Sequence, residues 1–68
     1  MTSTSISGDT ITLGQFLKLA NVIEAGGAAK ALLVQEEVQV NGDIEVRRGR
    51  KLVRGDVVVV AGESFTVS

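Results

Sequence analysis

The sequence predicts an α+β fold, in which two N-terminal helices pack on a small, bent sheet of antiparallel or mixed strands. Apolar residues recur at helical spacing in the first half of the chain and alternate with polar residues in the second half. The length of 68 residues leaves room for one domain. The apolar share of 44%, with almost no aromatic residues, predicts a compact aliphatic core.

The first nine residues are rich in Ser and Thr, and we expect a flexible tail over residues 1–9 ahead of a single domain over residues 10–68. Met1 and Ile6 are the only sizeable apolar residues of this segment, so it has little to pack with. It has neither a basic start nor a continuous apolar run, which argues against a signal peptide or a membrane anchor. Because the chain also has no Cys, a cytoplasmic location is favoured.

The first helix is predicted to begin after Thr12, which is suited to cap it, with Gln15 three residues later completing a capping box. Gly26 and Gly27 then interrupt the chain before a second helix, which is predicted over residues 28–36. The inward faces of the two helices are predicted to consist of Leu13, Phe16, Leu17 and Ala20 in the first, and of Ala29, Leu32 and Leu33 in the second.

The second half of the chain predicts strands joined by tight turns. A hairpin is expected around an Asn-Gly pair, with four alternating apolar residues on one face: Val38, Val40, Ile44 and Val46. A two-residue loop would place Val40 opposite Asp43 and separate the apolar pairs, so a three-residue loop over residues 41–43 is expected. A covered strand over residues 57–60 and a last short strand over residues 65–67 complete the predicted sheet.

The composition argues against an enzyme. The chain has no His and no Cys, so it lacks the usual general base near neutral pH, the thiol nucleophile and the common ligands of transition metals. The adjacent acids Glu36 and Glu37 diverge on a helix, which is typical of solvated surface. No catalytic residue, metal site or cofactor is predicted.

The net charge of −1 hides a strong segregation of charge along the chain. Between Arg47 and Arg54 the sequence has five basic residues and no acid, whereas the rest of the chain has Lys18 and Lys30 against all eight acids. A positive segment on an otherwise acidic molecule can attract a polyanion to one face while the remaining surface repels it.

The segment from Arg47 to Lys51 is the leading candidate for a binding site. A charged loop can simply be solvated, but the bias toward Arg favours forked contacts with phosphate oxygens. Gly49 lets the backbone turn sharply and exposes N–H groups to the same ligand, and Arg54 continues the positive segment. Lys30, in the second helix, either extends a phosphate-binding surface or is a solvated helix residue.

Two further features have alternative interpretations. The pair Gly26-Gly27 is either a plain turn between helices or an anion site at the free N–H groups of a helix start. The aromatic residues Phe16 and Phe65 both belong to apolar patterns, so no platform for stacking unpaired bases is expected. Recognition of shape and backbone is therefore favoured over base stacking.

The order of elements and three strings of residues resemble the S-four RNA-binding domain, named after ribosomal small-subunit protein four. The strings are Val38-Gln39-Val40-Asn41-Gly42, Arg47-Arg48-Gly49-Arg50-Lys51-Leu52 and Gly55-Asp56-Val57. The resemblance extends from about Thr12 to Val60. The segment Arg47–Lys51, which we call the basic loop, is similar to that of the stand-alone bacterial branch typified by YbcJ and YaaA proteins. The string Gly26-Gly27-Ala28-Ala29-Lys30 is similar to the same branch.

The resemblance implies a fold of the alpha-L motif type, in which RNA contacts the helix pair and the loop beside it. Lys30 occupies the place of a basic residue on the second helix of the family. Family members also carry basic residues where this chain has Thr12 and Gly26-Gly27. These departures shift the expected weight of RNA binding onto the basic loop.

The leading hypothesis is a monomeric, non-catalytic module that docks on structured RNA, ribosomal or transfer RNA, through phosphate contacts. An alternative is a protein-interaction adaptor that binds an acidic partner through the same loop, and a third is a fragment of an RNA-modifying enzyme without its catalytic domain. No membrane partner is expected. The candidate RNA-binding residues are Gly26, Gly27, Lys30, Arg47, Arg48, Gly49, Arg50, Lys51 and Arg54.

Overall fold

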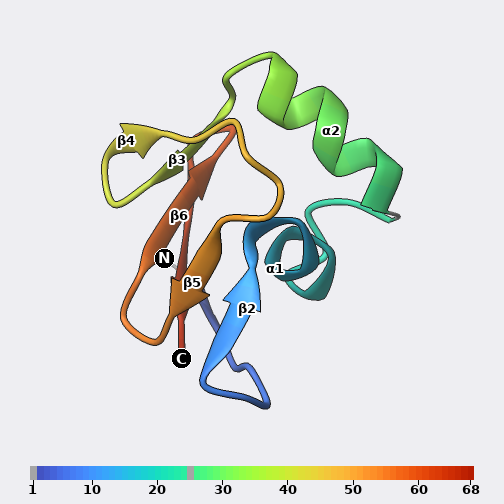
Figure 1. The fold of residues 1–68 in the computed structure, drawn as a ribbon. Coiled ribbons are helices and arrows are strands. Elements are labelled where there is room, and N and C mark those ends of the chain that lie inside the picture. The colour runs from blue at the N-terminus through green and yellow to red at the C-terminus, as the bar shows by residue number, and fades with distance from the viewer. Residues whose placement is uncertain (1, 25) are drawn as a thin grey trace.

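Two helices pack beside two small sheets in a computed structural model that describes residues 2–24 and 26–68 (Figure 1). The α+β class is confirmed. Two strands precede the helices, however, so the helices are not N-terminal as predicted. In chain order the elements are β1 (Thr2–Thr4), β2 (Thr10–Thr12), α1 (Leu13–Leu19), α2 (Gly26–Val34), β3 (Val38–Val40), β4 (Asp43–Ile44), β5 (Lys51–Val53), β6 (Val57–Val60) and β7 (Glu63–Val67).

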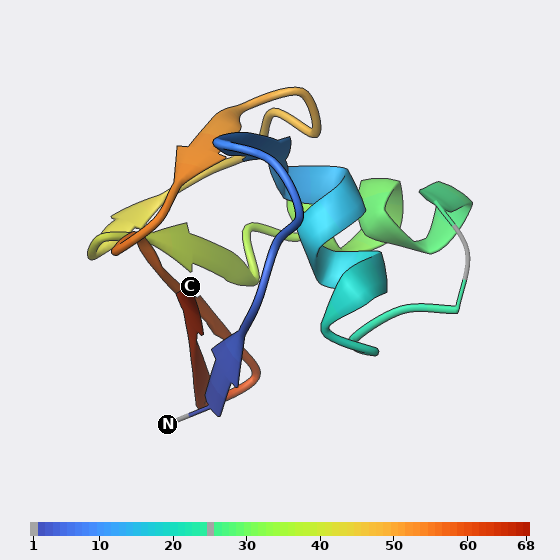
Figure 2. The same cartoon turned by 90° about the horizontal axis from the view of Figure 1, so that it is seen from below.

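The larger sheet has five strands in the order β1-β7-β6-β3-β4. It is mixed, because β1 runs parallel to β7 whereas the other neighbouring strands are antiparallel. The smaller sheet pairs β2 with β5 in antiparallel register, with Thr12 opposite Lys51. Figure 2 shows the two helices next to each other, to one side of the strands. The start of α1 and the end of the basic loop are thus joined directly through the small sheet.

The N-terminal segment is part of the fold, which corrects the prediction of a flexible tail for residues 2–9; Met1 lies outside the described residues. Strand β1 pairs with β7, and the Ser68 N–H donates to the Thr4 carbonyl at 2.9 Å. The Ile6 N–H donates to the Ser68 carbonyl at 2.8 Å, and its side chain is buried. The sequence argument weighed only apolar side chains, whereas the free edge of β7 offers backbone partners to any sequence.

Both predicted helices are confirmed, although the bounds of the second one shift. The Thr12 hydroxyl accepts a hydrogen bond from the Gln15 N–H at 3.3 Å, so the predicted N-cap is present. Helix α2 begins at Gly26, two residues before the predicted start, and ends at Val34. Glu36, which was expected inside the helix, has a φ of 58°. A residue in this left-handed region cannot continue an α-helix.

The core is aliphatic except for two Phe side chains, as the composition predicts. Leu13, Phe16 and Leu17 of α1 have no exposed surface, and Leu32 of α2 is half-buried. The buried apolar residues of the core are Ile6, Leu13, Phe16, Leu17, Ile23, Ala29, Leu33, Val38, Val40, Leu52, Val58, Val60, Phe65 and Val67.

The hairpin between β3 and β4 differs from the prediction, because its loop has two residues. Val40 lies opposite Asp43, and the intervening Asn41 and Gly42 have φ values of 52° and 90°. Positive φ at both positions is the geometry of a type I′ turn, which Asn-Gly favours.

This hairpin register turns the side chains of Ile44 and Val46 toward the solvent, and each residue is 54% exposed. The prediction that they face the core is wrong.

The Asn-Gly turn is tied to the turn before β6 by a side-chain network. Asn41 Nδ2 donates to Asp56 Oδ1 at 3.1 Å, and the Val57 N–H donates to Asn41 Oδ1 at 2.9 Å. The second oxygen of Asp56 accepts from the Val53 N–H at 2.9 Å. The Val-Asn-Gly and Gly-Asp-Val strings, distant in sequence, therefore form one structural unit that connects β3, β5 and β6.

Candidate nucleic-acid interface

Glu45 is a buried acid that organises the basic loop from inside. The two-residue turn that exposes its apolar neighbours directs Glu45 inward, where the residue is only 5% exposed. Its Oε2 accepts hydrogen bonds from the backbone N–H groups of Val46 and Arg47, each at 3.0 Å. Burial of a carboxylate is tolerated here because hydrogen bonds and cations compensate for the lost hydration.

Two of the loop guanidiniums bind this carboxylate. Arg47 Nε lies 3.1 Å from Glu45 Oε2, and Arg50 Nη1 lies 3.1 Å from Glu45 Oε1. Hydrogen bonds from the side chain and backbone of Arg47 lower the pKa of Glu45 to about 2, against the opposing effect of burial. The same ion pair raises the pKa of Arg47. The Arg47 side chain is still 74% exposed, so its outer face remains accessible to a ligand.

The loop is also fixed to the start of α1 by its backbone. The Leu13 N–H donates to the Arg50 carbonyl at 2.7 Å, and the Gly14 N–H donates to the Arg48 carbonyl at 3.0 Å. A Cβ added to Gly14 would lie 2.5 Å from Arg48 Cγ, so only glycine allows this approach without displacing the arginine. These contacts place Arg48 and Gly49 against the N-terminal end of the helix.

Arg48 lies between two surface hollows that bring other basic residues to it. One hollow is lined by Arg48 and Gly49 from the loop and by residues of α1 that include Gln15 and Lys18. The other is lined by Arg48, Lys30 and three apolar residues, Leu33, Val34 and Val46. We call the surface formed by Lys18, Lys30, Arg48 and Gly49 the Arg48 face. Among the described residues, no acid lines either hollow.

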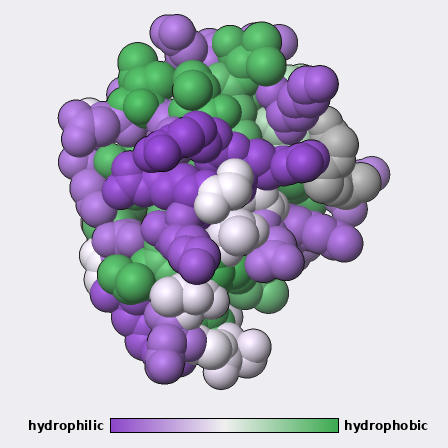
Figure 3. All heavy atoms as spheres, in the orientation of Figure 1, coloured by the Kyte–Doolittle hydropathy of each residue, from purple (hydrophilic) through white to green (hydrophobic). Residues whose placement is uncertain are grey.

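A space-filling view shows how this surface is distributed. Hydrophilic atoms gather in a band across the middle of the face, over the loop between β4 and β5 (Figure 3). Apolar atoms lie above this band in the same view. Three large apolar side chains are prominently exposed on α2, on β4 and just after β4, namely Val34, Ile44 and Val46. The basic surface therefore borders an apolar one.

The structure brings together some of the sequence candidates and separates others. Lys51 is exposed at the start of β5, next to the loop. Arg54 follows the other end of β5, where it lies 3.5 Å from Asp9 and donates to the Ile6 carbonyl at 3.3 Å. Gly26 and Gly27 form the first turn of α2, which Figures 1 and 2 show away from β5.

Lys18 is a surface residue that the sequence reasoning did not select. It lies off the apolar stripe of α1 and far from the loop in sequence, so nothing in the pattern connected it with Arg48. The docking of the loop on the start of α1 creates the proximity, and such a long-range contact leaves no local signal. The only indication in the sequence is that Lys18 is a basic residue on the solvent-facing side of the first predicted helix.

Within the described ranges, no group of three or more potential metal ligands occurs. Neither helix of the described chain is long and apolar enough to cross a membrane.

The chain belongs to the S4 domain family, whose model matches residues 4–68. A relative in Bacillus subtilis (strain 168), named as a probable ribosome maturation protein, RlbA, is 59% identical over 58 residues, covering 85% of this chain and 82% of the relative. YbcJ of Escherichia coli (strain K12), named as a candidate RNA-binding protein, is 37% identical over 57 residues, covering 84% and 81%. Both relatives are thus similar along most of their length.

The fold matches that of a solved relative as well. The solution structure of Escherichia coli YbcJ, described as revealing an alpha-L motif involved in RNA binding, superimposes with a TM-score of 0.74 at 34% sequence identity. The match covers 98% of this chain and 86% of that structure. The alpha-L type of fold expected from the family resemblance is therefore the one described for this solved relative.

Proposed function

We propose that the chain is a monomeric, non-catalytic module that binds structured RNA in the cytoplasm through the Arg48 face and the basic loop beside it. The observation that carries the proposal is the convergence of Lys18, Lys30 and Arg48 from two helices and a loop. The names of the relatives support RNA as the ligand. A concave basic surface without acids attracts a polyanion.

Phosphate contacts supply the main binding energy in this proposal. Arg48 offers a forked guanidinium to phosphate oxygens, whereas Lys18 and Lys30 act as mobile point charges on either side of it. Gly49 has open space around it, so a nucleic-acid backbone can approach the loop closely. Both Phe side chains are buried, so duplex shape and phosphate spacing determine recognition on this face.

Ribosomal RNA is the proposed ligand class. The Bacillus subtilis relative named for ribosome maturation shares 59% of its residues with this chain over the aligned region. RNA folded during ribosome assembly offers paired segments whose phosphates could span the Arg48 face. The proposal assigns the chain a docking role on such RNA, with no chemical step of its own.

Crosslinking identifies the ligand most directly. The tagged protein is crosslinked in the cells that make it, and the covalently bound RNA is sequenced beside a matched Arg48→Ala variant. We expect enrichment of discrete ribosomal RNA segments with the native protein and a clear loss of these segments with the variant. Background reads from both proteins would contradict RNA binding, and enrichment of transfer RNA alone would contradict the ribosomal assignment.

A protein-interaction adaptor is the second candidate, because apolar residues border the basic ones. Val34 is 70% exposed and lines the same hollow as Lys30 and Arg48. Mixed apolar and basic surfaces suit an acidic protein partner. If a Val34→Ser variant crosslinks to RNA normally but loses a co-purifying protein, the adaptor function accounts for this part of the surface.

A further inference from the structure

A hollow beside the Arg48 face shares only Lys18 with the surface proposed above. It has a volume of about 680 Å³ and is formed by β2 and the segment before it on one side and by α1 on the other. This volume is within the range of small-molecule sites, which is roughly 300–1,000 Å³. Gln15 and Lys18 line both this hollow and the one that contains Arg48, so the two surfaces are continuous.

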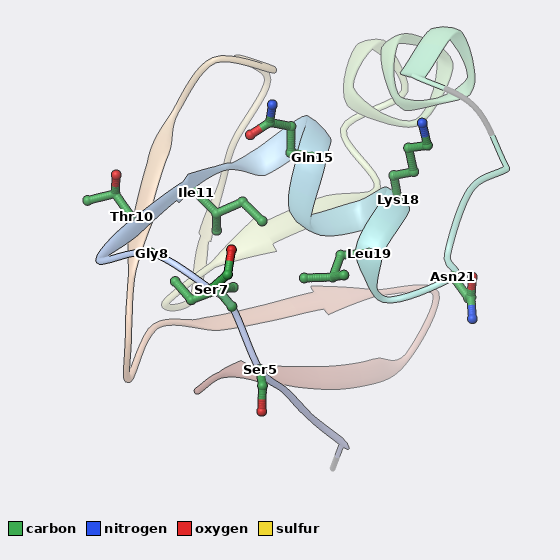
Figure 4. A pocket seen from close by; sticks show the side chains of 10 residues that line it. Ser5, Ser7, Gly8, Thr10, Ile11, Gln15, Lys18, Leu19 and Asn21 are labelled. Atoms are coloured by element: carbon green, nitrogen blue, oxygen red, sulfur yellow. The ribbon is translucent and has the colours of Figure 1, made fainter.

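The centre of the hollow is apolar and its rim is polar. Leu19 is 48% exposed, and Figure 4 shows Ile11 and Leu19 pointing toward one another across the hollow. The polar residues that line it include Ser7 and Thr10 on the N-terminal side and Gln15 on α1, whose amide can donate and accept hydrogen bonds. A nucleobase has the same division of character, with apolar faces and a polar edge.

The charge of the hollow also suits a nucleotide. Lys18 extends on the side nearest α2 in Figure 4 and also lines the hollow that contains Arg48. None of the described residues that line the hollow is an acid. Asp9 belongs to the same segment of chain but pairs with Arg54 at 3.5 Å. A phosphate attached to a base in the hollow would therefore meet one cation and no facing carboxylate.

We propose that this hollow receives one unpaired nucleobase of the RNA whose paired part lies on the Arg48 face, with Lys18 contacting the phosphate between them. The inference rests on the proposed function and extends it from recognition of a duplex to recognition of an irregularity in that duplex. Unpaired bases can leave the stack at small cost, which makes them available to a side pocket.

Three short RNA duplexes test this inference in direct titrations of the full chain. The first is fully paired, the second carries one unpaired adenosine, and the third carries an abasic nucleotide at the same place. We expect the adenosine duplex to bind on the order of fivefold more tightly than the other two, a modest gain suited to an aliphatic pocket. Equal binding of the adenosine and abasic duplexes would overturn the inference, because it would assign the gain to backbone flexibility.

A pair of variants locates the effect in the hollow. Leu19→Ala should remove the preference for the unpaired adenosine without changing affinity for the paired duplex. The control is Ile44→Ala, which truncates a similarly exposed aliphatic residue on β4, and it should keep the preference. Melting temperatures measured in parallel show that both variants remain folded. A preference that survives Leu19→Ala would overturn the inference.

Two results separate this inference from the proposed function. If no duplex binds at all, RNA binding itself fails. If all three duplexes bind equally and Arg48→Ala weakens all of them, RNA binding stands and the base pocket is wrong. Sedimentation of the native chain and of Leu19→Ala adds a further test, because self-association that this substitution abolishes would assign the hollow to a second copy and overturn the inference.

Discussion

Glu45 shows how one buried acid can shape a basic surface. Its carboxylate holds Arg47 and Arg50 from the inside and accepts two backbone N–H groups of the same turn. Arg48 lies between these two arginines in the sequence, and it lines the two hollows beside the helices. The acid thus reduces the net charge of the loop but fixes its conformation, which lowers the entropy that RNA binding must remove.

We expect Glu45→Gln to lower stability by about 1–2 kcal/mol, because the amide oxygen is a weaker acceptor than a carboxylate oxygen and the amide NH2 cannot accept any of these hydrogen bonds. The pKa of Glu45 is lowered from 4.5 to about 2. Its contribution to stability is therefore fully present above the ordinary pKa and is lost as the pH falls toward 2. Urea unfolding from pH 7 to pH 2 measures this.

The matched comparison for that prediction is Glu63→Gln, which removes an exposed acid at the start of β7. The stability difference between native chain and Glu45→Gln should shrink as the pH falls below 4.5, whereas Glu63→Gln should differ little from the native chain throughout. A constant difference for Glu45→Gln at every pH would show that the carboxylate charge contributes nothing to loop stability.

Gly14 is the second residue with a specific role, because it allows the close approach of Arg48. We expect Gly14→Ala to leave the melting temperature nearly unchanged, since the helix preference of Ala offsets part of the steric cost. RNA affinity should fall several-fold, because the new Cβ displaces the Arg48 side chain, whose Cγ would be 2.5 Å away. An unaltered affinity together with an unaltered melting temperature would mean that the position of Arg48 is unimportant.

At the scale of the elements, strand β1 completes the larger sheet at the edge formed by β7. Its register places Thr2 opposite Phe65 and Thr4 opposite Val67, which are both buried core residues. The strand therefore covers the edge of a strand that contributes directly to the core. An uncovered edge of this kind also invites pairing with other chains.

Deletion of residues 2–5 should lower the free energy of unfolding by about 1–3 kcal/mol, because backbone pairing is lost and the β7 edge becomes accessible. Chemical denaturation of the full and shortened chains measures the difference. Replacement of exposed Ser5 by Ala is the control and should have little effect. If the shortened chain is as stable as the native one, β1 does not dock in solution.

Local patterns predicted the helices well but could not predict the register of the hairpin. The cap at Thr12 and the face of α1 depend on spacing within a few residues, and both are confirmed. The rule that apolar residues face inward predicted a three-residue loop, whereas the turn preference of Asn-Gly determines the register. The cost of burying Glu45 in this register is offset by Arg47 and Arg50, which a binary pattern cannot reveal.

At the scale of the whole molecule, charge segregation in the sequence becomes a surface only through long-range packing. The sequence identified the basic segment, but the segment divides in the structure. Arg54 contacts the N-terminal segment, and the loop arginines lie at the start of α1. Lys18 and Lys30 lie near Arg48 because the two helices and the loop converge there. The spacing of these residues along the chain does not predict this proximity.

The salt dependence of RNA affinity, measured for single substitutions, tests the Arg48 face most directly. Each phosphate contact releases counterions, so losing one contact should lower the log–log salt slope by about one unit for every RNA sequence. We predict this for Arg48→Ala and, to a similar degree, for Lys18→Ala. Arg54→Ala, which removes a basic residue away from the face, should change the slope much less. Equal slopes for Arg48→Ala and Arg54→Ala would contradict the account, because attraction would then depend on total charge alone.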